Sequence, residues 1–357
     1  MTAHENGTTK AAVACEGVWQ VFGGDAEHAL GDALKQNDGD AKAAASLLRE
    51  RGLIAAVCDV NFEVGNGELF VIMGLSGSGK STLLRCISNL IRATAGRIEI
   101  EGEDLRTAGG RRLIELRREK LGMVFQHFGL FPHMDVIENV AYPLRVKGVP
   151  AKERRARADE VIRLVGLEER EDAYPRELSG GQRQRVGIAR SLAVDPSIWF
   201  LDEPFSALDP LIRRQLQDEF LRIQTHLKKS IVFVTHDIAE ALKLADRIAI
   251  MRDGEIVQVG TPAEIVLRPA NDYVRGFSRD VAKGKHACVD SIMLPLDKDA
   301  PGADADDPGL RPGMTLDAAL ASCMQLYEAV PVRDDNGNVI GSVRPKDLVA
   351  ALQVEDS

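Results

Sequence analysis

One glycine-rich stretch constrains this chain more than any other part of its sequence. Residues 74–82 read G-L-S-G-S-G-K-S-T and match the pattern G-x-x-x-x-G-K-[ST]. An apolar run, Leu69–Met73, precedes the stretch as expected for a strand, and leucines and isoleucine at helical spacing follow it over 83–90. Glycine leaves backbone N–H groups free to surround a phosphate, and a helix N-terminus adds its positive dipole end. In this context the stretch predicts a phosphate-binding loop.

Two side chains of the loop have predicted roles of their own. Lys80 can reach the β- and γ-phosphates of a nucleoside triphosphate, and the Ser81 hydroxyl can complete the shell of a Mg²⁺ ion. A Gly/Ser-rich linker is the alternative interpretation, but it leaves the flanking strand and helix unexplained. The other expected nucleotide-binding positions of the loop are Gly74, Ser76, Gly77, Gly79 and Thr82.

Composition limits the classes of function that the chain could have. Its 357 residues suggest two domains, and a net charge of −9 argues against a general nucleic-acid binder. No apolar run approaches the ~18 residues that a membrane span needs, and the polar N-terminus lacks the apolar core of a signal peptide. Five cysteines without C-x-x-C spacing fit reduced thiols in a cytoplasm.

The order of expected elements predicts the fold class. Strands alternate with helices, as in Ile198–Leu201, Pro210–Leu227 and Ile231–Thr235, which favours a mostly parallel α/β core. Asp253-Gly254 predicts a hairpin between two short strands. We expect a first domain over 1–280, a linker over 281–313 and a small α+β unit over 314–357. Within the first domain, helical insertions are expected at about 23–56 and about 127–178.

Two carboxylates follow the apolar strand that ends at Leu201. In a phosphate-loop fold, this position places Asp202 and Glu203 at the carboxyl edge of the sheet, where the nucleotide binds. Asp202 is suited to coordinating Mg²⁺ through water, and Glu203 to polarising an attacking water molecule. The alternative is a charged strand end that faces solvent, a common arrangement for an isolated Asp-Glu pair.

A second candidate anion site begins at a Leu-Ser-Gly-Gly-Gln sequence over 178–182. Ser179 is a good helix N-cap, while Gly180 and Gly181 leave their backbone N–H groups unobstructed, and Gln182 completes the site. One chain with a phosphate loop and a second such helix end could pair them between two copies. A two-fold dimer would then contain two composite nucleotide sites.

Together these motifs resemble those of the ATP-binding subunits of ABC transporters, over about residues 11–280. The resemblance implies a cytoplasmic ATPase with ATP and Mg²⁺ as its ligands. It assigns Gln126 to sensing Mg²⁺, the γ-phosphate and a membrane partner, and His236 to contacting the γ-phosphate. It also identifies Ser206–Asp209 as the segment called the D-loop, with Asp209 at the nucleotide site.

The adenine-stacking position of the family corresponds to Phe22. A phenylalanine can stack on a base because stacking needs only an aromatic face. Packing of Phe22 or Trp19 in the core is the alternative, since the expected insertion follows directly.

Further similarities point to one subfamily of importers, which takes up quaternary amines such as glycine betaine, proline betaine or choline. They are the insertion after Phe22, Leu75 in the phosphate loop, and the sequences over 206–213 and 271–275. Importers of other solutes, such as amino acids or polyamines, remain the alternative.

The C-terminal segment resembles a single CBS module, on the basis of Val330-Pro331-Val332, Asp335, Gly337, Ile340-Gly341 and Asp347-Leu348. Family members commonly carry a tandem pair, of which Val289–Met293 is a candidate remnant. The unit is either regulatory or a stabilising appendage without a ligand.

The resemblance also implies partners: two transmembrane permease subunits, a solute-binding protein, a second copy of this chain, and no nucleic acid. It places the chain peripherally, at the cytoplasmic face of the inner membrane. A soluble ABC-type ATPase acting on ribosomes or DNA is a less favoured alternative. The apolar residues expected to dock the permease are Phe128, Leu130, Phe131 and Met134.

Overall fold

The computed structural model of the chain describes residues 10–126, 129–278, 288–295, 309–323, 330–334, 337–344, 347–348 and 351. No helix among them has the length and apolar character that crossing a bilayer requires. The chain divides into two compact units. The first comprises Met1–Glu240 and Ala249–Ile256, and the second comprises Ala241–Ile248 and Val257–Ser357.

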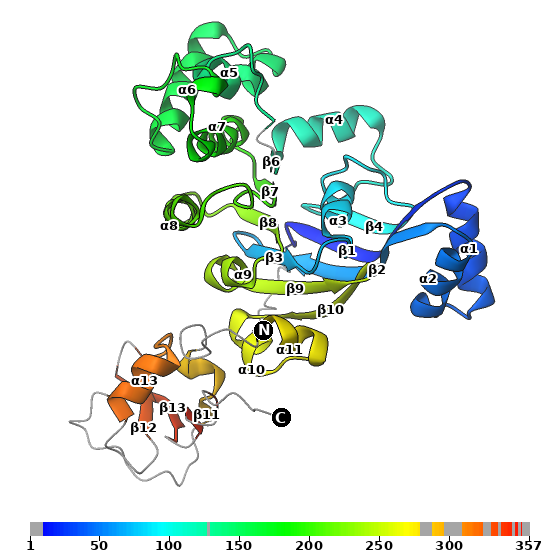
Figure 1. Cartoon of the computed structure of the whole chain (residues 1–357), viewed down its shortest axis with the longest axis vertical. Coiled ribbons are helices and arrows are strands. Elements are labelled where there is room, and N and C mark those ends of the chain that lie inside the picture. Colours follow the sequence, from blue (N-terminus) through cyan, green and yellow to red (C-terminus); the bar gives the residue numbers. More distant parts are fainter. Residues whose placement is uncertain are drawn as a thin grey trace, which may run out of the picture. The chain divides into compact units, whose positions relative to one another are not determined.

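A six-stranded sheet carries the phosphate loop, with strand order β10-β9-β3-β8-β7-β6 (Figure 1). Neighbouring strands are parallel from β3 through β8 and β7 to β6. Every residue of β3, β7 and β8 is buried, as expected for parallel strands that are covered on both faces. The strands are β3 (Leu69–Met73), β6 (Leu121–Val124), β7 (Ile198–Asp202), β8 (Ser230–Thr235), β9 (Arg247–Arg252) and β10 (Glu255–Gly260).

The parallel arrangement brings the carboxyl ends of three strands to one edge of the sheet. Met73, Asp202 and Thr235 end these strands, and the phosphate loop, Glu203 and His236 follow them directly. The hairpin expected at Asp253-Gly254 is confirmed: both residues have positive φ, 53° and 87°, between β9 and β10.

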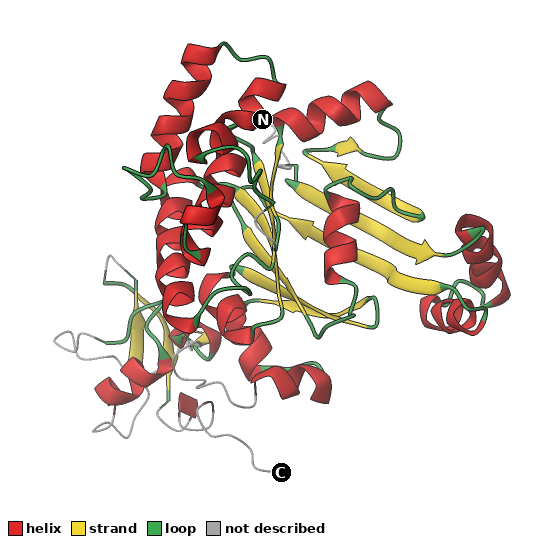
Figure 2. Cartoon of the chain, turned by 45° about the horizontal axis from the view of Figure 1, so that its top comes forward, coloured by secondary structure: helices red, strands yellow, loops and turns green. Residues whose placement is uncertain are grey.

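Helices surround the strands of the first unit (Figure 2). Three of them carry or follow expected site residues: α3 (Lys80–Ile87), α7 (Gly180–Leu192) and α8 (Pro210–Leu227). A further helix, α9 (Ile238–Leu244), begins shortly after His236. Four buried aromatic rings join α8 to the sheet: Trp199 lies 5.5 Å from Phe220, and Phe205 lies 5.8 Å from Phe233. The segment after Glu203 is therefore anchored by Phe205, which is fully buried.

A second, antiparallel sheet has the order β2-β1-β4-β5. Its strands are β1 (Val13–Phe22), β2 (Ile54–Val64), β4 (Ala95–Ile100) and β5 (Glu103–Asp104). Two helices, α1 (Ala26–Gln36) and α2 (Ala41–Glu50), lie between β1 and β2 in sequence. Leu30, Ala33, Ala44 and Leu48 of these helices pack around Trp19 of β1.

The inserted helices end earlier than the expected boundary near residue 56. Ile54 pairs with Phe22, so the β1–β2 ladder already begins there. Asp40 caps α2, accepting hydrogen bonds from two backbone N–H groups. Arg49 Nη2 donates to the carbonyl of Asp253 at 2.7 Å, which ties the insertion to the β9–β10 turn.

The helical segment between β6 and β7 begins with a capped helix. Asp135 and Glu138 form a capping box at the start of α5 (Val136–Val146). The fully buried Asn139 exchanges hydrogen bonds with the backbone of Phe131, at 2.8 and 3.1 Å, and fixes the segment that precedes the helix. The other helices of the first unit are α4 (Gly110–Glu119), α6 (Ala151–Leu164) and the 3₁₀ turn η1 (Pro175–Glu177).

The second unit has a small core of its own. Its three-stranded sheet has the order β11-β13-β12. Val289, Leu310, Val332 and Val343 are among its buried residues. Its elements are α10 (Pro262–Leu267), α11 (Asp272–Ser278), η2 (Val289–Ser291), β11 (Leu294–Pro295), α13 (Leu316–Cys323), β12 (Val330–Arg333) and β13 (Val339–Val343).

The structure differs here from the expected linker over 281–313. Val289 is fully buried and Leu294 pairs with Ser342, so residues 288–295 belong to the folded unit. Leu310 is buried as well, and its backbone pairs with β12. Part of the expected linker, 296–308, and Asp335 of the CBS resemblance lie outside the described residues.

The Phe205 anchor makes a testable prediction. Replacing Phe205 with alanine should lower the free energy of unfolding by about 3–5 kcal/mol, because the change leaves a cavity beside the rings of Phe220 and Phe233. Denaturant unfolding followed by circular dichroism measures this change. Leu211→Ala, which shortens a side chain that is 66% exposed nearby, is the control and should change stability by less than about 0.5 kcal/mol. Equal effects of the two substitutions would contradict the anchoring role.

Candidate functional site

The phosphate loop has room for a ligand at its tip and close packing at its base. A Cβ atom on Gly79 would lie 2.2 Å from the carbonyl oxygen of Ala56, so no larger residue fits there. Gly77 has a φ of 81°, and a Cβ atom on it would meet nothing within 4 Å. Leu75, Ser76 and Gly77 are exposed. The loop is therefore held from behind and open in front.

Lys80 begins α3 and is only 5% exposed. Its ammonium group donates to the carbonyls of Gly74 and Leu75 at 2.9 and 3.0 Å. Burial lowers the pKa of Lys80, against the opposing effect of the nearby Glu203 and Asp202 carboxylates. A buried cation held by two carbonyl dipoles next to an open loop is a site suited to an anion such as phosphate.

Ser81 and Asp202 form the second part of the site. The Ser81 hydroxyl donates to Asp202 Oδ1 at 2.9 Å, and the Asp202 residue is 6% exposed. Burial raises the pKa of Asp202, while the Ser81 hydrogen bond acts in the opposite direction. Hydroxyl and carboxylate oxygens are ligands that Mg²⁺ prefers. In the described part of the chain no three His, Cys, Asp or Glu side chains lie together as a metal site, so such an ion would also need phosphate and water oxygens.

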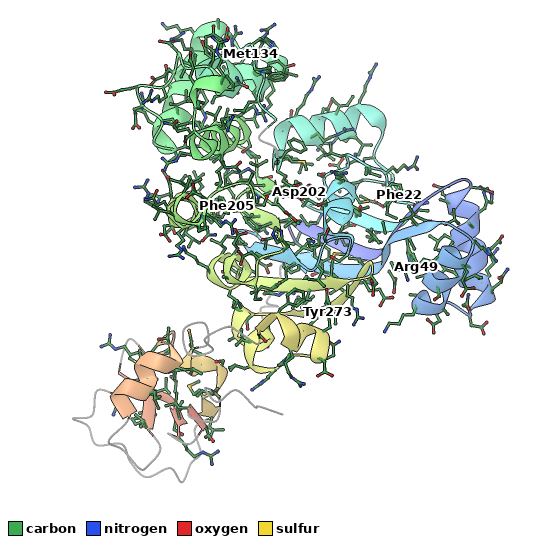
Figure 3. All side chains as sticks on the ribbon, in the orientation of Figure 1. Phe22, Arg49, Met134, Asp202, Phe205 and Tyr273 are labelled. Carbon is green, nitrogen blue, oxygen red and sulfur yellow. The ribbon has the colours of Figure 1, made fainter. Side chains whose placement is uncertain are left out.

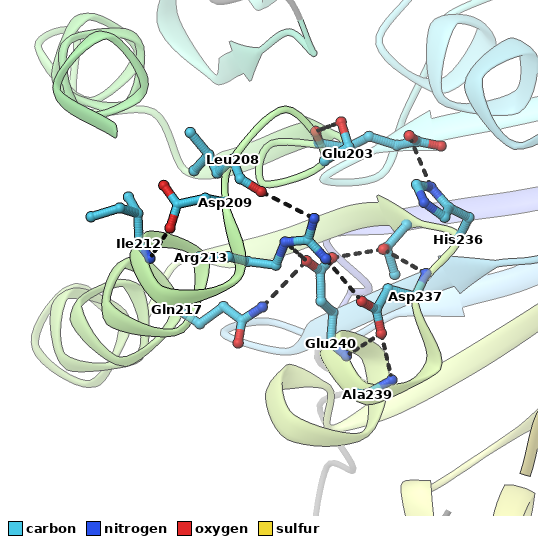
Figure 4. Close-up of polar contacts among 12 residues, drawn as sticks. Glu203, Leu208, Asp209, Ile212, Arg213, Gln217, His236, Asp237, Ala239 and Glu240 are labelled. Carbon is cyan, nitrogen blue, oxygen red and sulfur yellow. Dashed lines mark hydrogen bonds and ion pairs between the residues drawn. The ribbon is translucent and has the colours of Figure 1, made fainter. Parts of the chain in front are cut away.

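Glu203 follows Asp202 in the chain (Figure 3 labels Asp202) and lies at the centre of the third group, where its carboxylate meets His236 (Figure 4). Its Oε2 atom lies 3.0 Å from His236 Nδ1 and accepts from Gln126 Nε2 at 3.4 Å. Gln126 also donates to Ser206 Oγ at 3.5 Å. Glu203 has a φ of 45°, a left-handed conformation that costs about 1–3 kcal/mol in a non-glycine residue. Such strain is typical of functional positions.

The Leu-Ser-Gly-Gly-Gln helix end lies elsewhere in the same unit. Ser179 and Gln182 form a capping box, with hydrogen bonds of 2.9 and 3.2 Å. A Cβ atom on Gly181 would lie 2.7 Å from Ile212, next to the helix that Asp209 caps. Among the described residues no hydrogen bond joins this helix end to the phosphate loop.

Thr82, Phe22 and Trp19 complete the expected set. Thr82 is half-buried on the first turn of α3, next to Ser81. Trp19 belongs to the core around the inserted helices, whereas Phe22 is 38% exposed at the end of β1 and is accessible to a stacking partner. Sequence reasoning missed Arg213, which binds the segment after Glu203. The sequence does contain one signal for Arg213: it is a basic residue in the first turn of a helix, where the helix dipole favours acidic residues.

Comparisons with known proteins agree with this geometry. The family model described as ABC transporter matches residues 57–206. The chain is 50% identical over 337 residues to the trimethylamine N-oxide transport system ATP-binding protein TmoW of Pelagibacter ubique, covering 94% of this chain and 96% of that protein. It is 52% identical over 235 residues to the glycine betaine/proline betaine transport system ATP-binding protein ProV of Salmonella typhimurium, covering 66% and 59%.

Solved structures give the same result for the fold. A dimeric ATP-binding cassette in a post-hydrolysis state with bound ADP and phosphate has a TM-score of 0.58 and 33% sequence identity. The similarity covers 70% of this chain and 98% of that one.

The environment of Lys80 makes a prediction about stability. Lys80→Met should leave the unfolding free energy of the ligand-free protein nearly unchanged, because relief from burying a charge offsets the loss of two carbonyl hydrogen bonds. MgATP at about 100 times its dissociation constant should stabilise the wild type by about 2.7 kcal/mol and the variant not at all. Thermal melting with and without MgATP measures both effects.

The pH dependence provides a second measurement on the same variant. The folded-state pKa of Lys80 is lowered, so the unfolded chain binds more protons between the folded and unfolded pKa values. The ligand-free wild type should therefore gain stability relative to Lys80→Met as the pH rises through that alkaline range. Lys35→Met, on the exposed side of α1, is the control. Retention of MgATP stabilisation in Lys80→Met would contradict the assignment.

Proposed function

This chain belongs to the ATP-binding subunits of ABC transporters, and from this premise we propose that it powers the uptake of a small methylated amine. It is an ATPase coupled to solute transport. The observation that carries the solute class is the 50% identity to a trimethylamine N-oxide transport subunit over 94% of the chain. Relatives named for glycine betaine transport, at 48 to 52% identity, support the same class.

Trimethylamine N-oxide, glycine betaine and choline share a methylated, positively charged nitrogen. Within this class, trimethylamine N-oxide is the first candidate, because the match to its transport subunit extends over 96% of that protein. The match to the glycine betaine/proline betaine subunit of Salmonella typhimurium covers 59% of that protein. The ATPase itself does not bind the solute, so the choice among these amines is made by its partners.

The geometry suggests a division of roles at the nucleotide. Lys80 and the loop N–H groups would hold the β- and γ-phosphates, while Ser81 and Asp202 would hold Mg²⁺. The ion would neutralise the charge that develops on the phosphates. Glu203 would orient the attacking water and accept its proton, with Gln126 and His236 keeping the carboxylate in place.

A second copy of the chain would complete the site. Ser179, Gly180, Gly181 and Gln182 are not hydrogen-bonded to the phosphate loop of their own chain, yet their helix end is suited to an anion. A two-fold dimer would place this end, together with Asp209, over the partner's phosphate loop. The dimeric structure of the similar cassette supports this arrangement.

An apolar pocket near Gln126 is the proposed docking site for a permease subunit at the cytoplasmic face of the membrane. It has a volume of about 420 Å³. Its apolar lining includes Met123 of β6, Val146 of α5, and Phe125 and Phe131 from the segment between these elements. Arg117, Arg118, Lys147 and Arg190 also line it. A short permease helix with an apolar centre and acidic flanks would match this surface. Leu130 and Met134 do not line the pocket, and Phe128 lies outside the described residues.

The C-terminal unit is proposed to be a single CBS-like module. Its sheet and its separate core support an independently folded element, beginning near residue 288 rather than at 314. Ala263 and Leu267 of α10 pack against this core, so the boundary with the ATPase lies closer to α10 than the sequence suggests.

The transport proposal predicts a specific pattern of stimulation. The chain should be assembled in vesicles with its two permease subunits and its solute-binding protein. Its ATPase rate should rise when trimethylamine N-oxide or a betaine is loaded, because closure of the two ATPase copies depends on the partner. Hydrolysis of MgATP and uptake of labelled solute are measured together.

The controls test two things separately: which class of solute is transported, and whether stimulation depends on contact with the permease. Phe131→Ala should reduce the stimulation without changing MgATP binding, since it removes part of the docking pocket. Uptake of amino acids or polyamines with no response to methylated amines would refute the solute class. Full activity of the isolated chain, unchanged by any partner, would instead favour a soluble ATPase.

The composite site predicts the behaviour of Glu203→Gln. The amide cannot accept a proton, so hydrolysis should fall by a factor of about 10² to 10⁴ while MgATP binding persists. Since ATP is not consumed, two chains should remain joined, and light scattering in MgATP should show a dimer. Adding Lys80→Ala should return the mass to that of a monomer. Near-native hydrolysis by Glu203→Gln would transfer the role of base to another residue, with His236 as the first to test.

A further inference from the structure

Arg213 connects two segments near Glu203, the proposed catalytic carboxylate. One segment follows β7 and the other follows β8. Its Nη2 donates to the carbonyl of Leu208 at 3.2 Å, and its Nη1 donates to Asp237 Oδ2 at 3.3 Å (Figure 4). Leu208 belongs to the segment after Glu203, and Asp237 directly follows His236. One planar guanidinium group therefore joins the segment after β7 to the segment after β8.

The other side of the guanidinium faces a buried carboxylate. Glu240 on α9 is 4% exposed and lies 3.8 Å from Arg213 Nε. The Thr235 hydroxyl donates to Glu240 Oε2 at 2.7 Å, and Gln217 Nε2 donates to Oε1 at 3.2 Å. Thr235 Oγ1 in turn accepts from the backbone N–H of Asp237 at 3.0 Å. The segment around His236 is thus part of one polar network with Arg213.

The position of Arg213 indicates that its side chain holds neighbouring segments in place and does not serve to stabilise its own helix. It lies in the first turn of α8, where the helix dipole disfavours a cation, and its ion-pair partners among the described residues, Asp237 and Glu240, lie outside that helix. Those partners come from the segment after β8. A lysine in place of Arg213 would lack the planar group that contacts Leu208 and Asp237 at once.

We propose that Arg213 is a positioning residue for ATP hydrolysis, which fixes the Leu208–Asp209 segment relative to His236. This proposal rests on the function proposed above, since Asp209 is expected at the partner copy's nucleotide. Through Arg213, a displacement of His236 at one nucleotide is transmitted to the segment that reaches the other. The coupling element is a chain of side-chain and backbone contacts, from Glu203 through His236 and Asp237 to Arg213 and Leu208.

The test compares variants in the assembled transporter. Arg213→Gln should lower kcat for MgATP about tenfold and leave KM nearly unchanged, because the nucleotide-binding residues are not altered. Arg213→Lys should recover part of the loss. Arg214→Gln, which removes the same charge from an exposed neighbour, is the matched control and should retain wild-type kinetics.

A double-mutant cycle with Asp237→Asn isolates the contact. The amide keeps the oxygen that caps α9 through Ala239 but replaces the oxygen that accepts from Arg213. The double variant should be no slower than Arg213→Gln alone. Wild-type kcat in Arg213→Gln, or additive losses in the cycle, would overturn the proposal.

Two other outcomes remain decisive. If Arg213→Gln fails to fold, Asp237→Asn decides alone, and wild-type kcat in that variant overturns the role of Arg213. Failure of the proposed function is separate, because it would appear in the wild type as an ATPase rate that no methylated amine changes.

Discussion

Opposite charges buried at one edge of a parallel sheet are the constraint on which this site depends. Lys80 and Asp202 are 5% and 6% exposed, and removing an ion from water costs several kcal/mol unless partners replace the water. Lys80 donates hydrogen bonds to two backbone carbonyls, and Asp202 accepts one hydrogen bond from the hydroxyl of Ser81. A triphosphate with its cation would supply the missing charges to both. In the ligand-free site the charges of Lys80 and Asp202 are therefore only partly compensated. Compensating them contributes to the affinity for a triphosphate and its cation.

The sequence predicts the parts of the fold whose chemistry is local. The strand–loop–helix around Lys80, the caps at Asp135 and Ser179, and the Asp253-Gly254 turn each depend on residues within a few positions of one another. The edge position of Glu203 also follows, because parallel strands end together. These elements needed no knowledge of distant contacts.

Long-range packing is the part that local patterns do not contain. Val289 belongs to a segment that the sequence suggests as the remnant of a second module, yet it packs in the core of the C-terminal unit with Val332 and Val343. The expected linker over 281–313 is rich in proline and glycine only after residue 300. This composition gives no information on residues 288–295, which belong to the folded unit. Likewise Arg213 is one of many helical arginines in the sequence, and only the approach of β8 beside β7 gives it Asp237 as a partner.

The phosphate loop is held from behind by a turn that lies far downstream in the chain. The N–H group of Gly254 donates to the carbonyl of Ser78, and the N–H group of Cys58 donates to Gly254. A ribosome completes the loop's sequence long before it makes this turn. During synthesis Ala56, behind Gly79, is made before the loop, whereas the contact between Gly254 and Ser78 can form only after β9 and β10 have been made. The full set of contacts behind the loop is thus completed late in synthesis, by the last strands of the sheet.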